Sequence, residues 1–107
     1  MPRHLMGEFE HLVLLAIIRL GDQAYGVPVI REVESRTGRQ VSQAAAYLTL
    51  RRLEEKGWVK GRAGEATTRR GGRPKRYYSV TAQGRQKLRQ ARSGLLNMWA
   101  GIVEELQ

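Results

Sequence analysis

A basic, glycine-containing loop that runs directly into a strand-like segment constrains this chain more than any other feature. The loop is Arg69-Arg-Gly-Gly-Arg-Pro-Lys-Arg76, and the segment that follows it is Tyr77-Tyr-Ser-Val-Thr81. Upstream, Trp58-Val-Lys-Gly-Arg62 has the composition and alternation of a first strand. The two segments therefore predict a β-hairpin whose connecting loop is rich in Gly, Thr and Arg.

The segment before this hairpin predicts a helix that begins after Ser42 and runs to Lys56. Ser42 is a good N-cap, because its hydroxyl can accept a hydrogen bond from an otherwise unpaired amide of the first turn. Gly57 can end the helix in a left-handed conformation. A helix, a hairpin and a basic hairpin tip, in this order, are typical of the winged helix-turn-helix, in which the helix enters the major groove of DNA and the tip rests on phosphates.

Three further helices complete the predicted fold. Apolar residues from Phe9 to Leu20 recur at three- and four-residue steps, and a second helix with Pro28 in its first turn ends near Thr37-Gly38. Thr81 can cap a last helix, whose apolar stripe comprises Leu88, Leu95, Trp99, Ile102 and Leu106, widened by Leu96, Met98 and Val103. We predict an α+β, mostly helical fold: a winged helix-turn-helix domain over residues 1–81 and a C-terminal dimerisation helix over residues 82–107.

Positive charge is concentrated in the second half of the chain. Residues 1–50 are balanced, whereas residues 51–90 contain thirteen Lys and Arg against three Glu, and the whole chain has a formal charge of +9. A basic surface this local is an electrostatic footprint for a polyanion, because neutralised phosphates release condensed counterions. The alternative is solvated charge that serves solubility.

Length and composition bound the remaining possibilities. A chain of 107 residues that is 41% hydrophobic forms one small domain that buries about two-thirds of its unfolded surface, so we expect self-association. The longest apolar run, Leu12–Ile18, is too short to span a bilayer, and Glu8 and Glu10 before it do not fit a signal peptide. We therefore predict a cytoplasmic protein with no membrane partner. The absence of cysteine excludes disulfides and Cys-ligated zinc.

Enzymatic chemistry finds little support in the residues. His4 and His11 are the only histidines, and no Ser/His/Asp set, paired carboxylates or phosphate-cradling loop occurs at a mechanistic spacing. The seven-residue step from His4 to His11 lacks carboxylate support for a metal. We expect no catalytic residue, no metal and no cofactor.

The outward face of the third predicted helix contains most candidate DNA contacts. If Ala46, Leu50 and Leu53 face the core, a rotation of about 100° per residue places Gln43 and Tyr47 at the margins of the outward face. The side chains that point directly away from the core are then Ala44, Ala45, Leu48, Arg51 and Arg52. Gln43 could pair with adenine and Ala45 or Leu48 could touch thymine methyls, while Arg51 and Arg52 reach phosphates. The cations of the hairpin add phosphate or minor-groove contacts. A half-buried packing role for Tyr47 stays open. The candidate set is Ser42, Gln43, Ala45, Tyr47, Leu48, Arg51, Arg52, Arg73, Lys75 and Arg76.

Short motifs over residues 7 to about 90 follow one another in a specific order: Tyr25-Gly26, Ser42 to Tyr47, Leu50, Arg51-Arg-Leu-Glu54, Gly57, Gly71-Gly-Arg73, Lys75 to Tyr78, and Thr81 with Gly84. In this order and spacing they resemble the PadR family of bacterial transcriptional regulators. The resemblance implies a compact member that dimerises through its first and last helices. The chain departs from the family at Ala44-Ala-Ala46 and Leu48, where glycine, threonine or proline is frequent, so no operator sequence is carried over.

The predicted function is a homodimeric repressor that occludes a promoter by binding a palindromic operator in double-stranded DNA. The resemblance further implies that Trp99 could sandwich a small planar aromatic effector between subunits. The predicted effector and dimer residues are Leu95, Met98, Trp99, Ile102 and Leu106, although this stripe could instead pack on the first helix of its own subunit. A non-specific architectural or RNA-binding protein and a dimeric adaptor for another protein remain alternatives.

Overall fold

The computed structural model describes residues 5–64 and 75–106. Its elements, in chain order, are α1 (Glu8–Leu20), η1 (Gly21–Gln23), α2 (Gly26–Thr37), α3 (Gln43–Glu55), β1 (Val59–Ala63), β2 (Arg76–Val80), α4 (Ala82–Trp99) and η2 (Val103–Leu106). This order confirms the predicted mostly helical α+β fold of the winged helix-turn-helix type. The first strand begins one residue later than predicted, because Trp58 lies in the preceding turn and buries its side chain in the core.

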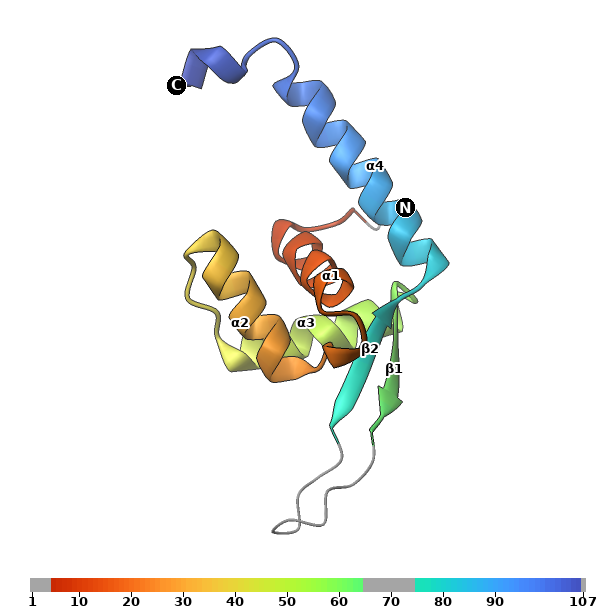
Figure 1. Cartoon of the computed structure of the whole chain (residues 1–107). Coiled ribbons are helices and arrows are strands. Elements are labelled where there is room, and N and C mark those ends of the chain that lie inside the picture. Colours follow the sequence, from red (N-terminus) through yellow and green to blue (C-terminus); the bar gives the residue numbers. More distant parts are fainter. Residues whose placement is uncertain (1–4, 65–74, 107) are drawn as a thin grey trace.

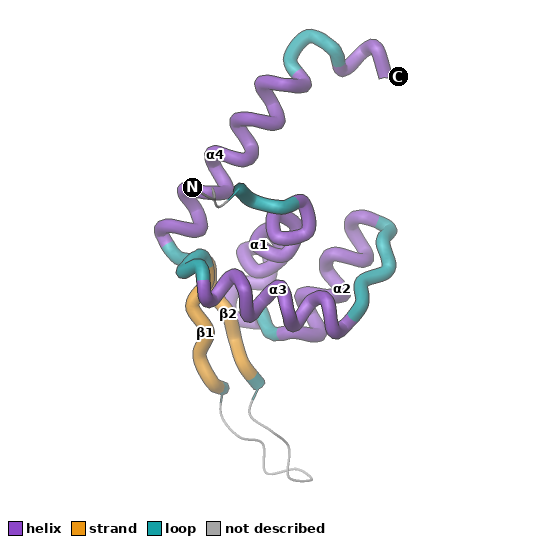
Figure 2. The backbone as a smooth tube through the Cα atoms, turned by 180° about the vertical axis from the view of Figure 1, so that it is seen from behind, coloured by secondary structure: helices purple, strands orange, loops and turns teal. Residues whose placement is uncertain are grey.

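Helices α1, α2 and α3 form a body from which α4 and the hairpin leave in opposite directions (Figure 1). Strands β1 and β2 pair antiparallel, with Val59 opposite Val80. The other edge of β2 contacts the segment before α2, where the Tyr78 amide donates to the Ala24 carbonyl at 2.8 Å and Tyr25 bridges to Tyr77. The wing is therefore hydrogen-bonded on both sides of β2, and it extends from the α3 side of the helical body (Figure 2).

The hydrophobic core lies between the three helices and the base of the wing. Its fully buried side chains come from α1, α2, α3 and the turn before β1: Val13, Leu14, Ile17, Val29, Leu50, Leu53 and Trp58. Ala46 is also buried, so the predicted inward face of the third helix is confirmed. Thr49 shares this inward face, which leaves the rest of α3 facing outward.

The predicted end signals form at the start and end of α3 and at the start of α4. The Ser42 hydroxyl accepts a hydrogen bond from the Ala45 amide at 3.2 Å, and Gly57 has a left-handed φ of 78°. Thr81 accepts from the Gly84 amide at 3.0 Å and donates to the Gly57 carbonyl at 2.7 Å. A Cβ at Gly84 would lie 2.2 Å from the Trp58 carbonyl oxygen, so the first turn of α4 approaches the backbone more closely than any other residue allows.

The last helix is shorter than predicted. It ends at Trp99, and Gly101 adopts a φ of +83° before the η2 turn. The prediction that Ile102 and Leu106 continue one helical stripe was therefore wrong. Glycine has a low helix propensity and reaches positive φ without strain, so a segment with few packing neighbours breaks there. Within the described residues, no helix is long and apolar enough to cross a membrane.

Candidate nucleic-acid interface

The outward face of α3 presents a mixed apolar and basic surface. Gln43, Ala45 and Arg51 are exposed, and Leu48 is 45% exposed although it is a large apolar residue. These side chains point away from the core, as the helical spacing predicts. Alanine and leucine can contact thymine methyls but form no hydrogen bonds to base edges, so Gln43 and Arg51 supply most of the polar contacts that this face can make.

Tyr47 combines exposure with packing. It is 43% exposed, yet its ring covers the first residue of α2: a Cβ at Gly26 would lie 2.4 Å from the Tyr47 hydroxyl oxygen. The ring therefore fixes the start of α2 against α3, while the exposed part remains beside the outward face. The structure thus shows the half-buried packing considered for Tyr47, and its contact with DNA stays a prediction.

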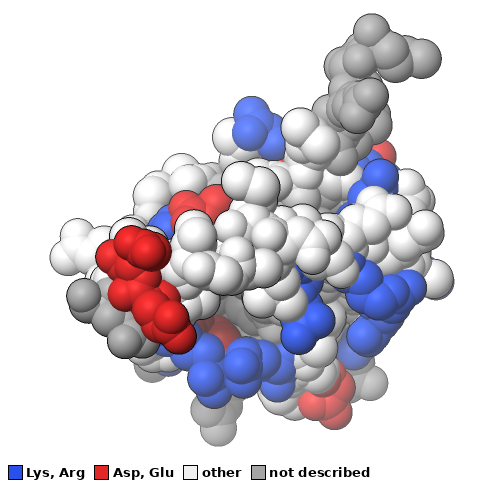
Figure 3. Space-filling model, turned by 90° about the horizontal axis from the view of Figure 1, so that it is seen from above, with Lys and Arg blue, Asp and Glu red and all other residues white. Residues whose placement is uncertain are grey.

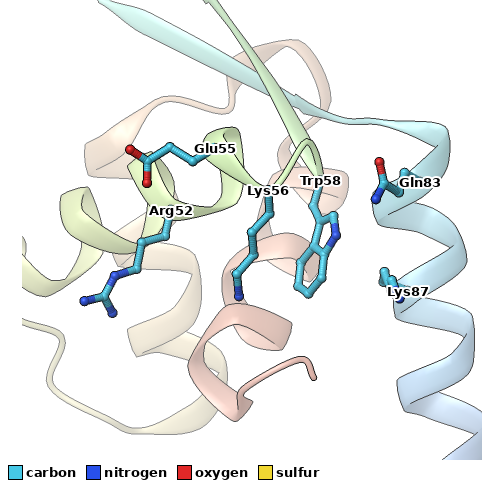
Figure 4. Close-up of a pocket in the computed structure, with 6 residues that line it drawn as sticks. All are labelled: Arg52, Glu55, Lys56, Trp58, Gln83 and Lys87. Atoms are coloured by element: carbon cyan, nitrogen blue, oxygen red, sulfur yellow. The ribbon is translucent and has the colours of Figure 1, made fainter. Parts of the chain in front are cut away.

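Arg51 and Arg52 lie on different sides of α3. Arg52 borders a hollow of about 480 Å³ between the end of α3 and the start of α4, lined also by Glu55, Lys56, Trp58, Gln83 and Lys87 (Figure 4). Lys56 Nζ lies 4.6 Å from the centre of the Trp58 ring and 2.6 Å from Glu10 Oε2. Sequence spacing could have predicted that Arg52 and Lys56 are neighbours on α3, because they are four residues apart. It could not have predicted that Lys87 of α4 lines the same hollow, because that depends on the tertiary fold.

One face of the wing base carries stacked cations and aromatic rings. Lys75 Nζ lies 4.4 Å from the centre of the Tyr25 ring and 3.3 Å from its hydroxyl oxygen. The Tyr25 and Tyr77 rings meet edge to face at 5.3 Å, and the Arg62 guanidinium lies 4.9 Å from the Tyr77 ring. Two wing cations are thus held by aromatic faces at the base of the hairpin.

The opposite face of the wing base contacts α3 through an ion pair. Arg76 Nη2 lies 2.5 Å from Glu54 Oε2, and Arg76 Nε lies 3.3 Å from Glu54 Oε1. The hydrogen bond and the charge of Glu54 raise the pKa of Arg76 above its usual value. The sequence prediction missed Glu54, because 22 residues separate the partners. Arg73, the other predicted wing contact, lies outside the described residues.

The predicted dimer residues belong to α4 and to the segment after it, on the far side of the body from the wing (Figure 1). Leu95, Met98, Trp99, Ile102 and Leu106 are all exposed. A groove of about 480 Å³ runs between α1 and α4, lined by His11, Leu15, Ile18, Arg85, Leu88, Arg89 and Arg92. Seen from above, the molecule presents a broad uncharged surface, bordered by Lys and Arg side chains and, at the left, by a cluster of acidic side chains (Figure 3).

A recognition-type helix beside a hairpin anchored on both faces defines the winged helix-turn-helix class of proteins. Within that class, a model of the "Transcriptional regulator PadR-like family" matches residues 14–90, and the chain belongs to this family. A protein of uncharacterised function from Lysinibacillus sphaericus is 28% identical over 100 residues, which cover 92% of this chain and 84% of the relative.

Solved structures of other family members share the fold. A PadR family transcription regulator from Clostridium difficile R20291 has a TM-score of 0.76 at 21% identity, covering 94% of this chain and 100% of that one. Bacillus subtilis PadR in complex with operator DNA has a TM-score of 0.66 at 21% identity, covering 79% of this chain and 46% of that one. The part of the B. subtilis protein that this chain matches is therefore less than half of its length.

Proposed function

We propose that this protein is a cytoplasmic, homodimeric transcriptional repressor that occludes a promoter by binding a palindromic operator, and that it acts by binding and not by catalysis. The observation that carries the proposal is the exposed face of α3 standing beside the base of a basic wing. Family membership and the operator complex of the related B. subtilis PadR support it. Within the described residues, no cluster of three or more His, Cys, Asp or Glu side chains could hold a metal ion.

The proposed DNA contacts divide by chemistry. Gln43 pairs with a base, Ala45 and Leu48 contact thymine methyls, and Ser42 and Tyr47 border this reading surface. Arg51, Lys75 and Arg73 meet phosphates, and Arg52 extends the basic surface on the flank of the helix. This assignment rests on the exposure of these α3 side chains and on the concentration of positive charge in residues 51–90.

The proposed dimer uses the surface of α1 and α4. The groove between these helices is lined by apolar side chains that include Leu15 and Ile18 and by the arginines of α4. The segment after α4 combines apolar side chains with Glu104 and Glu105, which complements that groove in both respects. A second copy of the chain is therefore a fitting occupant. We propose that residues 1–81 form the DNA-binding domain and residues 82–107 the dimerisation unit.

A second candidate function is non-specific, architectural binding of nucleic acid. The composition of the reading face favours it, since Ala44, Ala45 and Leu48 offer no hydrogen bonds to bases. Such a protein would bind through phosphates alone, and its affinity would not depend on sequence.

Competition between two DNA samples separates these functions. Duplexes selected from a random pool by the wild-type protein are challenged with bulk genomic DNA. A regulator prefers its selected duplex by at least about a thousandfold, and an architectural protein shows no such preference. Gln43→Ala should change the preference among selected duplexes. Equal weakening for every duplex would contradict the proposed docking of α3.

Salt dependence tests the electrostatic part of the proposal. With about three to four phosphate contacts per subunit, the slope of log affinity against log salt should be near −6 for a dimer. A slope shallower than about −2 would contradict the assignment of the basic surface to phosphates.

The proposed effector is a small planar aromatic compound that binds at Trp99, which is 42% exposed at the end of α4. Such compounds should quench the fluorescence of the wild-type protein and leave that of Trp99→Phe unchanged, because Trp58 is buried and shielded by Lys56. A panel of flat compounds that quenches neither protein would remove the effector role of Trp99.

A further inference from the structure

Arg76 joins the wing to α3 through a contact with fixed geometry. It is the first residue of β2, and its Nη2 and Nε atoms face the two carboxylate oxygens of Glu54 at 2.5 Å and 3.3 Å. Two contacts from one guanidinium fix the orientation of the partners as well as their distance. Because the partners are 22 residues apart, the contact joins α3 directly to β2, two elements that are distant in the sequence.

Gly61 of β1 provides the path that Arg76 takes to Glu54. A Cβ at Gly61 would lie 2.7 Å from Arg76 Nε, 2.8 Å from Nη2 and 2.9 Å from Cζ. The guanidinium therefore lies directly against the Gly61 backbone. Gly61 is not among the glycines with positive φ, so the close approach of Arg76, and not the backbone conformation, requires a residue without a side chain here.

The same contact controls a negative charge beside the candidate interface. Glu54 lies on the wing side of α3, and an unpaired carboxylate there would repel DNA phosphates. Burial raises the pKa of Tyr78 on β2, and the negative charge of Glu54 raises it further. The Arg76 and Glu54 side chains are 49% and 31% exposed. A pair this exposed adds little to stability, so its main effect is on geometry and local charge.

We propose that Arg76 is a positioning residue and not a phosphate contact. With Glu54 and Gly61 it forms a wing clamp, which fixes the angle between α3 and the hairpin. Helix and wing then meet DNA in one relative orientation, so that the base contacts of α3 form only where the phosphates under the wing are in register. The clamp therefore increases selectivity for the operator over bulk DNA. This inference rests on the proposed DNA-binding function.

The double variant Arg76→Gln with Glu54→Gln tests the clamp without changing the net charge. Full-length protein is titrated with the selected duplex and with bulk DNA over a series of salt concentrations. We expect the wild-type salt slope and a preference for the selected duplex reduced about tenfold. If Arg76 instead contacts a phosphate, the slope becomes shallower by about 0.9 per subunit. That result, or an unchanged preference, overturns the proposal.

Two single variants approach the clamp from other directions. Gly61→Ala displaces the Arg76 guanidinium and keeps every charge, so we expect the same loss of preference with the wild-type slope. Glu54→Gln releases Arg76 toward phosphates, so bulk DNA should bind more tightly. Weaker binding of bulk DNA by Glu54→Gln would contradict the clamp. Thermal unfolding checks that each variant folds, and if Gly61→Ala does not fold, the double variant decides.

A charge control and the wild type complete the experiment. Lys60 is exposed on β1, outside the wing clamp, so Lys60→Gln should keep the preference for the selected duplex. A loss as large as that of the double variant would show that the preference responds to any polar substitution at the base of the wing, and it would overturn the clamp. A wild-type protein that prefers no duplex would contradict the proposed function itself. Wild-type selectivity that survives in both the double variant and Gly61→Ala would contradict only the clamp.

Discussion

The helical body, formed by α1 to α3, and the last helix, α4, differ in how far they bury their apolar side chains. In the body, helices α1 to α3 bury Leu14, Ile17 and Leu50 almost completely. In α4, only Gly84 and Leu88 are buried, and the large apolar side chains beyond them are exposed. Burial of a leucine or isoleucine side chain contributes about 1.5–3 kcal/mol. The body gains this stabilisation within the chain, whereas the exposed apolar side chains at the end of α4 gain little of it there.

The attachment of α4 to the body explains why its apolar side chains are less buried. Its first turn is fixed by Thr81 and by the close approach of Gly84 to the Trp58 carbonyl, and Leu88 packs on the core. Beyond Leu88 the helix extends away from the body (Figure 1). Exposed apolar patches of this kind mark interaction sites in soluble proteins. The body thus buries its apolar side chains within the chain, and the exposed end of α4 supports the proposed dimer interface.

The largest expected effect contrasts a leucine from each region. Leu50→Ala removes a fully buried side chain of α3 and should lower the free energy of unfolding by about 2–5 kcal/mol. Leu95→Ala removes a side chain that is 53% exposed and should cost less than about 0.5 kcal/mol in the monomer. Chemical denaturation at several protein concentrations measures both.

Concentration dependence is the control for this contrast. The loss in Leu50→Ala should be the same at every protein concentration, whereas any loss in Leu95→Ala should appear only where the dimer forms, because association stabilises the folded state by mass action. A large, concentration-independent loss in Leu95→Ala would mean that α4 belongs to the core of its own subunit.

A second, smaller effect concerns assembly. Combining Leu95→Ala with Trp99→Ala should weaken the dimer by at least about 2 kcal/mol, because truncation of large interface side chains commonly has effects of this size. Sedimentation velocity should then show a shift toward monomer at concentrations where the wild type is a dimer. Val27, which is 36% exposed on α2 and so outside the proposed interface, supplies a Val27→Ala control. Unchanged sedimentation of the double variant would contradict the proposed interface.

The sequence predicts most of the fold because its signals are local. Ser42, Gly57 and Thr81 mark element ends through hydrogen bonds and conformations that depend on a few neighbouring residues. The end of α4 was missed for the opposite reason. Hydrophobic spacing from Leu95 to Leu106 predicts a continuous helix, but without packing in the described chain the weak propensity of Gly101 prevails.

In the candidate interface too, the sequence predicts the local features and not the contacts between distant residues. Helical spacing correctly separates Leu50 and Leu53 from the exposed Leu48 and Arg51. The partners of Arg76 and Lys75 were not predictable, because Glu54 and Tyr25 are 22 and 50 residues away along the chain. Positive charge alone indicates phosphate, and only the fold reveals which cations already have a partner.

The smallest expected effect compares the caps of α3 and α4, and it tests whether the attachment of α4 is a local event. Ser42→Ala removes one hydrogen bond to the Ala45 amide at an exposed helix start, so we expect a loss of about 0.5–1 kcal/mol. Thr81→Ala removes two part-buried hydrogen bonds, to the Gly84 amide and the Gly57 carbonyl, and should cost about 1–2 kcal/mol. Thr81→Ser keeps the hydroxyl and is the matched control.

Amide hydrogen exchange should show that Thr81→Ala increases exchange in the first turns of α4 and leaves α1 unchanged. Equal acceleration throughout α1 would mean that α4 and the body unfold as one unit, and the contrast between the two regions would then hold for burial but not for cooperativity.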